Sequence, residues 1–190
     1  MEPFLYLASA SPRRVELLLQ LPIRFKQIPN LLESEVLNPT EGSIRNQIKQ
    51  LCVRKALASA STYDKWILTA DTCVVLNDTV FGKPKNSKES TNMLMTLSGK
   101  THHVISACCL YHPTSHQHYT CSDSAQVTFN MLTKNDIDHY IQSCHPFDKA
   151  GSYAIQDIPE HFLAHLKGSY DTVMGLPSKQ LKKLLKRIYT

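Results

Sequence analysis

The sequence predicts an α/β or α+β fold, because strand-like and helix-like segments are mixed along its 190 residues. Short apolar segments bounded by turn residues are typical of strands, and several stretches with apolar residues at helical spacing lie between them. With 42% hydrophobic and 19% charged residues, the composition is that of an ordinary globular protein. We expect one domain over 1–190, composed of two closely joined lobes whose boundary the sequence does not define.

The first half of the chain alternates strands and helices. A buried strand is expected at 4–8. Ser11 then caps a helix that has Pro12 at its first position and ends before Pro22. A second helix is expected over 41–59. Strand segments follow at 66–70 and 73–76, and a turn at 77–78 leads into 79–81.

The second half begins with a helix that Ser87 caps and that stops at Gly99. Two long β-rich stretches, 101–111 and 117–131, are joined by a turn. Thr133 and Asp136 resemble a capping box for a fourth helix. A loop and a strand are expected within 148–156, a strand at 161–166, and a last amphipathic helix from Ser178.

Charge and cysteine content narrow the class of protein. The net charge is +5, which suits an anionic partner but identifies none. No apolar run reaches membrane-spanning length and no signal peptide is recognised, so we expect a cytoplasmic protein without a membrane partner. The basic last helix has a regular apolar stripe and no interleaved aromatic residues, so nucleic-acid binding is not expected. The six cysteines are expected to be buried and reduced.

The first chemical signal is the corner Ser9–Ala10–Ser11–Pro12–Arg13–Arg14 between a strand and a helix. Backbone N–H groups at a helix N-terminus, serine hydroxyls and guanidinium groups together suit a polyphosphate. A plain serine cap with two solvated arginines explains the same residues equally well.

The second signal is Lys55, which helical spacing places on the same stripe as Ile44, Ile48 and Leu51. A lysine on an inward face needs an anionic partner or must extend its ammonium group outward. Both interpretations stay open on these residues alone.

The third signal is Asp71–Thr72 inside an apolar β segment. A carboxylate there needs a cation, either a hard metal ion with a substrate phosphate or an ion pair with Lys83. The fourth signal is the segment from Asp148 through Lys149 to Gln156, where small residues precede an amide that can pair with a base edge. Its alternative is an ordinary turn and strand.

Together these segments resemble the Maf (septum-formation) family of nucleotide pyrophosphatases. The resemblance covers almost the whole chain in order: LASASPRR at 7–14, KA at 55–56, ADT at 70–72, GKP at 82–84, LSGKTH at 97–102, VTF at 127–129, DKAGSYAIQ at 148–156 and VMGLP up to 177. It implies a two-lobed α/β fold with a central mixed sheet flanked by helices and a cleft between the lobes, similar to the inosine-triphosphate pyrophosphatases.

The resemblance also implies an activity and its site. Nucleoside triphosphates would be cut between the α and β phosphates with a divalent cation, Mg²⁺ or Mn²⁺, by a protein that is commonly a homodimer. Asp71, Glu33 and Lys83 match catalytic positions, and Glu33 and Asp71 would hold the metal. The expected substrate-binding residues are Ser9, Ser11, Arg13, Arg14, Lys55, Thr72, Lys149 and Gln156.

Within the family, Arg13, Thr72 and Gln156 resemble the dTTP/UTP branch. A neutral amide matches a pyrimidine edge, whereas a carboxylate would suit guanine. The 7-methyl-GTP branch and a nucleotide-binding regulator without hydrolysis remain alternatives, because Arg54, Thr69 and His145 depart from the family pattern. His112, His116 and His118 are expected in an exposed polar turn rather than a metal site.

Overall fold

The computed structural model describes residues 4–60 and 63–189, which form two compact units. The first unit draws on 4–71, 106–123 and 175–189, and the second on 72–105 and 124–174. The described residues contain strands β1 (Phe4–Ala8), β2 (Arg24–Ile28), β3 (Ile67–Leu76), β4 (Thr79–Phe81), β5 (Thr101–Tyr111), β6 (His118–Phe129) and β7 (Leu163–Lys167). The helices are α1 (Pro12–Leu19), α2 (Ile44–Ala58), α3 (Ser87–Leu97), α4 (Lys134–Cys144), α5 (Tyr170–Met174) and α6 (Ser178–Tyr189).

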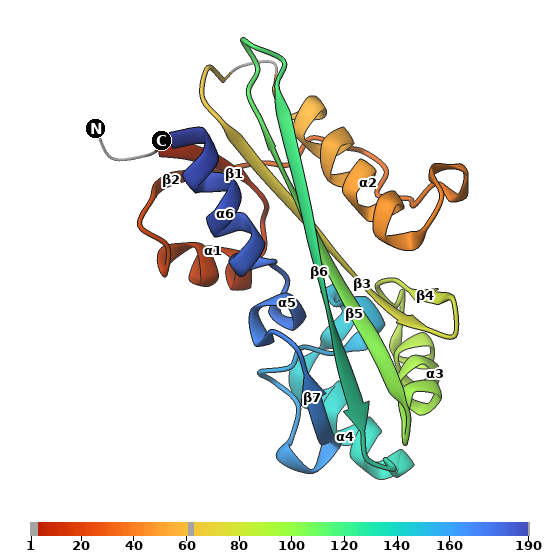
Figure 1. Cartoon of the computed structure of the whole chain (residues 1–190). Helices are drawn as coiled ribbons and strands as arrows, with labels where there is room; N and C mark the ends of the chain where they lie inside the picture. The colour runs from red at the N-terminus through yellow and green to blue at the C-terminus, as the bar shows by residue number, and fades with distance from the viewer. Residues whose placement is uncertain (1–3, 61–62, 190) are drawn as a thin grey trace. The chain divides into compact units, whose positions relative to one another are not determined.

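The strands form one mixed sheet in the order β2-β1-β3-β5-β6-β7, and β4 pairs with β3 (Figure 1). β1 runs parallel to β2 and to β3, whereas β4 is antiparallel to β3 and β7 is antiparallel to β6. The chain is therefore α/β with a mixed sheet, as expected.

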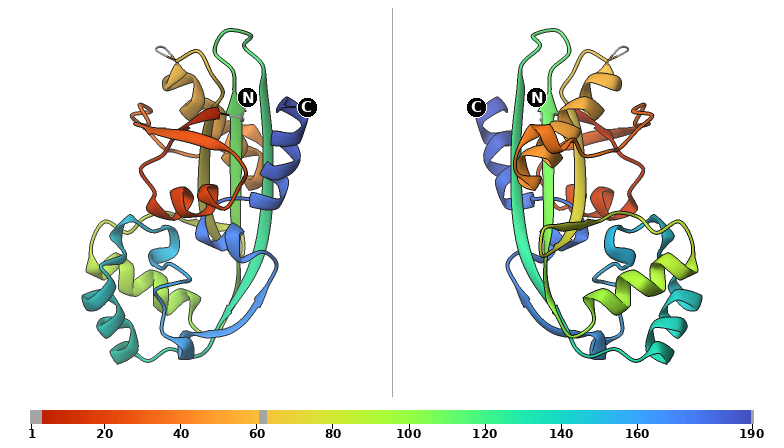
Figure 2. Two further views of the ribbon diagram at one scale, coloured as in Figure 1. Left: turned by 90° about the vertical axis from the view of Figure 1, so that its left-hand side faces the viewer. Right: turned by 90° about the vertical axis from the view of Figure 1, so that its right-hand side faces the viewer.

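In the first unit, α2 and α6 cover opposite faces of the sheet (Figures 1 and 2). The α2 face includes Ala107, whose carbonyl accepts from the Cys52 thiol. The α6 face includes Tyr119, whose ring lies 4.7 Å from the Arg187 guanidinium carbon. The apolar stripe of α6 is buried at Leu181 and Leu185, while most of its lysines face solvent.

The second unit contains α3 and α4, which pack against each other and against the turns after α4. Its core includes a ring cluster in which the Nε2 of His102 lies 2.7 Å from the Tyr153 hydroxyl and the Phe129 ring packs against both. Ser90 of α3 is bonded to Ser152, which ties the helix to the segment after α4.

The expected capping box of α4 is confirmed. Thr133 accepts from the backbone N–H of Asp136, and the Asp136 carboxylate accepts from the Thr133 backbone in return. The cap of α3 differs from the prediction: Asn86, one residue before Ser87, accepts from the backbone N–H of Glu89. Both side chains satisfy N–H groups that have no partner within the helix.

Three expectations about secondary structure are corrected. The strand expected within 148–156 is absent: 3₁₀ turns at Pro146–Asp148 and Ala150–Ser152 are followed by a turn, because Gly151 and Ser152 have φ near +65° and cannot extend a strand. β3 is continuous through Asp71 and Thr72 rather than split. β2, an edge strand with little apolar pattern, and the short helix α5 were not expected.

Candidate functional site

The carboxyl ends of the parallel strands β1 and β2, beside the middle of β3, bring the candidate residues of the first unit to one edge. β1 lies between β2 and β3, with Ala8 opposite Ile28 and Leu7 opposite Leu68. The chain after β1 begins at Ser9, the loop 29–43 follows β2, and Asp71 lies just beyond the paired part of β3. This edge is where open parallel sheets commonly bind ligands.

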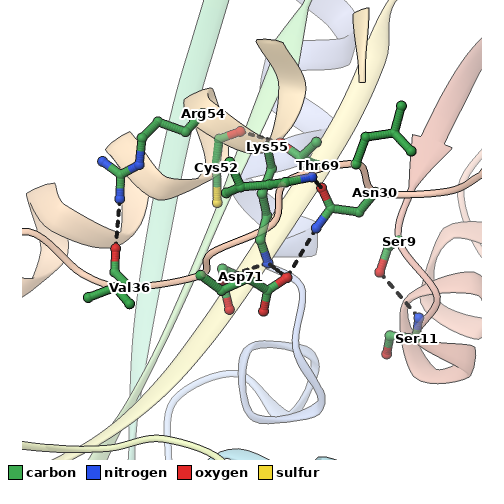
Figure 3. Close-up of polar contacts among 12 residues, drawn as sticks. Ser9, Ser11, Asn30, Val36, Cys52, Arg54, Lys55, Thr69 and Asp71 are labelled. Carbon is green, nitrogen blue, oxygen red and sulfur yellow. Dashed lines mark hydrogen bonds and ion pairs between the residues drawn. The ribbon is translucent and has the colours of Figure 1, made fainter. Parts of the chain in front are cut away.

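Lys55 is the centre of this group. Its side chain is buried, with 4% of the residue exposed, yet its Nζ lies 2.7 Å from Asp71 Oδ2 and 2.8 Å from Glu35 Oε1 (Figure 3). The lysine thus lies on the inward face of α2 and has anionic partners there. Since both oxygens contact the same ammonium group, the two carboxylates converge on one point.

Hydrogen bonds between α2 and β3 fix the position of Lys55. The Thr69 hydroxyl, fully buried, donates to the Cys52 carbonyl at 2.7 Å. Cys52 precedes Lys55 by about one turn, so this bond sets the register of the helix on the strand. Thr69, a departure from the family pattern, therefore has a clear structural role. Burial, and next the Asp71 carboxylate, raise the pKa of the Cys52 thiol.

The loop between β2 and α2 supplies Glu35. The Asn30 amide donates to Glu35 Oε1 at 3.0 Å. The Arg54 guanidinium donates to the Val36 carbonyl at 2.9 Å (Figure 3). The same guanidinium forms an ion pair with Glu41. Sequence analysis missed Glu35, since nothing in the pattern separates it from Glu33. Glu33 lies exposed in the same loop.

The corner before α1 is arranged around Ser9. Its buried hydroxyl accepts from the Ser11 backbone at 3.3 Å and from the Arg14 guanidinium at 3.2 Å, and Arg14 Nε donates to the Gly175 carbonyl at 3.0 Å. Arg14 therefore ties this corner to the chain before α6. Ser11 is the N-cap residue by position, but its side chain makes no capping bond. Arg13 is partly exposed on the first turn of α1.

The other predicted substrate residues belong to the second unit. Thr72 is half-buried in β3, and Lys83 is exposed after β4. Lys149 is buried, with its Nζ 2.7 Å from Asp148 Oδ1. Gln156 is exposed in a turn rather than in the expected strand.

The donor set at Lys55 is compatible with a hard cation. Among residues 4–60 and 63–189, no group of three or more histidine, cysteine or acidic side chains is arranged to hold a metal ion. Mg²⁺ does not require such a group, because one or two carboxylates with substrate phosphates and water complete its octahedral shell. Asp71 and Glu35 provide two converging carboxylates, and carboxylate oxygens are the ligand type that Mg²⁺ and Mn²⁺ prefer.

The fold and this edge define an α/β protein whose mixed-charge site lies at the carboxyl ends of parallel strands. The family described as Maf-like protein matches residues 4–188, and the chain belongs to that family. No helix in the described part of the chain is both long and apolar enough to cross a membrane.

Several curated relatives are similar over nearly their full length. A protein of Aquifex aeolicus (strain VF5) is 38% identical over 183 residues, covering 96% of this chain and 94% of the relative. One from Escherichia coli (strain K12) is 41% identical over 184 residues, with 95% and 91% covered. One from Pseudoalteromonas translucida (strain TAC 125) is 39% identical, with 95% and 94% covered. Each is named dTTP/UTP pyrophosphatase.

Solved structures show a weaker likeness. The nucleoside-triphosphatase / dITP/XTP pyrophosphatase of Mycobacterium abscessus has a TM-score of 0.41 at 10% identity, covering 68% of this chain and 75% of that one. The Ham1 protein of Staphylococcus aureus has a TM-score of 0.46 at 13% identity, covering 66% and 71%.

Proposed function

We propose that this protein is a nucleoside triphosphate pyrophosphatase that hydrolyses dTTP or UTP to the monophosphate and pyrophosphate. The observation that carries the proposal is the buried Lys55, held between Asp71 and Glu35 where β3 continues past the end of β1. The activity in the names of the curated relatives, which are about 40% identical, supports the same reaction and the same pair of substrates.

In this proposal Asp71 accepts a proton from the attacking water. The water oxygen bonds to the α-phosphorus while the bond from that phosphorus to the α–β bridging oxygen breaks, and pyrophosphate leaves. The ion pair with Lys55 fixes the direction of the Asp71 carboxylate. The buried ammonium group also offsets negative charge that develops on the phosphates.

A divalent cation, when bound, would supply Lewis-acid polarisation of the phosphate and partial neutralisation of its charge. We propose Asp71 as one protein ligand and an acid of the β2–α2 loop as the other. Glu33 is the acid that the family resemblance implies, and Glu35 is the acid beside Lys55. Titrating activity with Mg²⁺ in Glu33→Gln and Glu35→Gln compares the two acids, and the variant that lacks the ligand should need the larger increase in Mg²⁺ concentration.

The remaining roles follow from the resemblance and stay proposals. Arg13 would contact the triphosphate, together with Ser9, Ser11 and Arg14 at the same corner. Lys83 is proposed as a catalytic cation, with Thr72 and Lys149 on the nucleotide. The exposed amide of Gln156 would select the pyrimidine edge.

The central test is Asp71→Asn, which keeps the shape of the side chain and removes the base. We expect pyrophosphate release from dTTP to fall by about 10²–10⁴-fold while the protein stays folded. Asp78→Asn, in the exposed turn between β3 and β4, is the matched control and should keep full activity. Full-rate turnover by Asp71→Asn would exclude the proposed role of this carboxylate.

A panel of nucleoside triphosphates then separates the alternatives. Preference for dTTP and UTP over 7-methyl-GTP supports the proposal, and the reverse preference assigns the chain to the other branch. Saturable nucleotide binding with no pyrophosphate release with either Mg²⁺ or Mn²⁺ would identify a non-hydrolysing regulator instead.

We also propose that the protein acts as a homodimer, as the family resemblance implies, and that it acts in the cytoplasm without a nucleic-acid partner, as its sequence composition suggests. Sedimentation velocity tests the dimer, and cell fractionation tests the location. If the protein shows no steeply salt-dependent DNA binding, this result supports the absence of a nucleic-acid partner.

A further inference from the structure

Two cysteines that have no role in the proposed reaction face each other across the β5–β6 hairpin. The Sγ atoms of Cys108 and Cys121 lie 3.2 Å apart. We propose that Cys108 and Cys121 are a redox modification site that peroxide converts to a cross-strand disulfide. This inference does not depend on the proposed pyrophosphatase activity.

The register of the hairpin places the two cysteines directly opposite each other. The His112 N–H donates to the Gln117 carbonyl next to the turn, and farther along the hairpin Thr101 bonds to Thr128 and the His103 ring to Gln126. Counting inward from any of these pairs brings Cys108 opposite Cys121. Opposite residues of an antiparallel pair have Cα atoms about 4.5–5.5 Å apart. This separation lies within the range of about 4.4–6.8 Å that disulfides span.

The two thiols differ in accessibility. Cys108 is fully buried, whereas Cys121 is only partly buried. The hydrogen bond with Cys121, together with burial, raises the pKa of the Cys108 thiol, which slows the direct reaction of Cys108 with peroxide. Oxidant therefore reaches Cys121 first, and Cys108 acts as the resolving thiol.

The chemistry balances in two steps with hydrogen peroxide as the oxidant. Cys121 loses its proton, its thiolate attacks a peroxide oxygen and forms a sulfenic acid, and the hydroxide that leaves takes up that proton to become water. Cys108 sulfur then attacks the sulfenic sulfur, the S–O bond breaks, and the leaving hydroxide takes the Cys108 proton as water. Two thiols are oxidised and one peroxide is reduced to two waters, and the hairpin keeps its register because the residues already pair.

Alternation along β5 supplies a matched control. Cys109, next to Cys108, points to the opposite face and is also buried. The full-length protein and the variants Cys108→Ala, Cys109→Ala and Cys121→Ser are treated with hydrogen peroxide, alkylated and analysed by mass spectrometry. Native protein and Cys109→Ala should each lose two hydrogen atoms and two alkylatable thiols, with a cross-link between the peptides of Cys108 and Cys121.

The link should vanish in Cys108→Ala and in Cys121→Ser, and dithiothreitol should reverse it in the native protein. Circular dichroism shows that each variant is folded before treatment. Three results would overturn the proposal: a link that survives in Cys108→Ala, a link between Cys108 and Cys109, or stable sulfenic or sulfinic acid at Cys121 without a link.

Discussion

Lys55 shows how a single residue can be both buried and charged. An isolated ammonium group is costly to bury, and the cost is offset only by well-placed opposite charges and hydrogen bonds. Asp71 and Glu35 provide two such contacts at 2.7 and 2.8 Å. The lysine in turn stabilises the two carboxylates, because without it they would face each other with no cation between them.

This balance predicts that Lys55→Met destabilises the protein by about 2–4 kcal/mol, since the two carboxylates lose their shared partner. Urea unfolding measures the change, and Lys65→Met, at an exposed lysine, should cost under about 0.5 kcal/mol. Added Mg²⁺ should raise the melting temperature of Lys55→Met more than that of the native protein, since the cation replaces the lost charge. An equal rise in both proteins would contradict a cation site at these carboxylates.

Arg54 acts on the neighbouring loop rather than on the site itself. Its guanidinium contacts the Val36 carbonyl and the Glu41 carboxylate. It therefore fixes both ends of the segment from Val36 to Glu41, which directly follows Glu35. Arg54 directly precedes Lys55 in α2, and consecutive helical side chains diverge. Arg54 therefore anchors the loop, while Lys55 contacts the Glu35 carboxylate of that loop.

We predict that Arg54→Ala raises the KM for nucleotide about tenfold and leaves kcat within about threefold, because the loop loses two anchors worth roughly 1–2 kcal/mol together. Steady-state kinetics measure the split. The exchange Arg54→Glu with Glu41→Arg should recover part of the loss, whereas Arg54→Glu alone should not. A fall in kcat with unchanged KM would argue against a positioning role.

At the scale of single elements, the helices of the second unit depend on their first turns. The capping box satisfies the N–H groups at the start of α4, whose inward face carries Ile137, Tyr140 and Ile141. A helix of this length is marginal by itself, so its cap and its packing both contribute.

Thr133→Ala should therefore lower the free energy of unfolding by about 1 kcal/mol, with pyrophosphate release at 25 °C unchanged. Thermal or urea unfolding gives the value. Thr114→Ala, in the exposed turn between β5 and β6, is the control and should have no measurable effect. Equal stability of Thr133→Ala and native protein would show that packing alone holds α4.

At the scale of the whole molecule, acid stability depends on His102. Burial, and next the nearby His103, lower the pKa of His102 from 6.5 to about 4. Its ring contacts Phe129 and the Tyr153 hydroxyl, and burial raises the pKa of Tyr153. The neutral imidazole is therefore the form that fits the core.

The unfolded chain binds the proton of His102 below about pH 6.5, whereas the folded chain binds it only near pH 4. The contribution of His102 to the free energy of unfolding is therefore fully present above pH 6.5. It is lost as the pH falls toward 4, and the total loss is about 3 kcal/mol. The variant His102→Gln keeps a side chain that can form hydrogen bonds but does not take up a proton in this pH range. Its free energy of unfolding should depend less on pH across this window, and His165→Gln, at an exposed histidine, should behave like the native protein.

The parts of the fold that the sequence predicted are those with strong local patterns. The β5–β6 hairpin, the capping box of α4 and the inward face of α2 follow from alternation, turn residues and helical spacing. β2 was missed because its residues Arg24–Ile28 are mostly exposed at the sheet edge and carry no alternation. The strand expected within 148–156 was wrong because the positive φ values of Gly151 and Ser152 turn the backbone.

By itself the sequence determined the mixed α/β class, the place of Lys55 on the apolar stripe of its helix and membership of the Maf family, because periodicity and ordered motifs are properties of the chain. Only the tertiary structure decided which acids meet that lysine. Asp71 and Glu35 are 36 positions apart and come together because β2 and β3 flank β1 in parallel, so that the loop after β2 lies near the part of β3 that continues past β1. Such long-range pairing depends on strand order, which local sequence patterns do not encode.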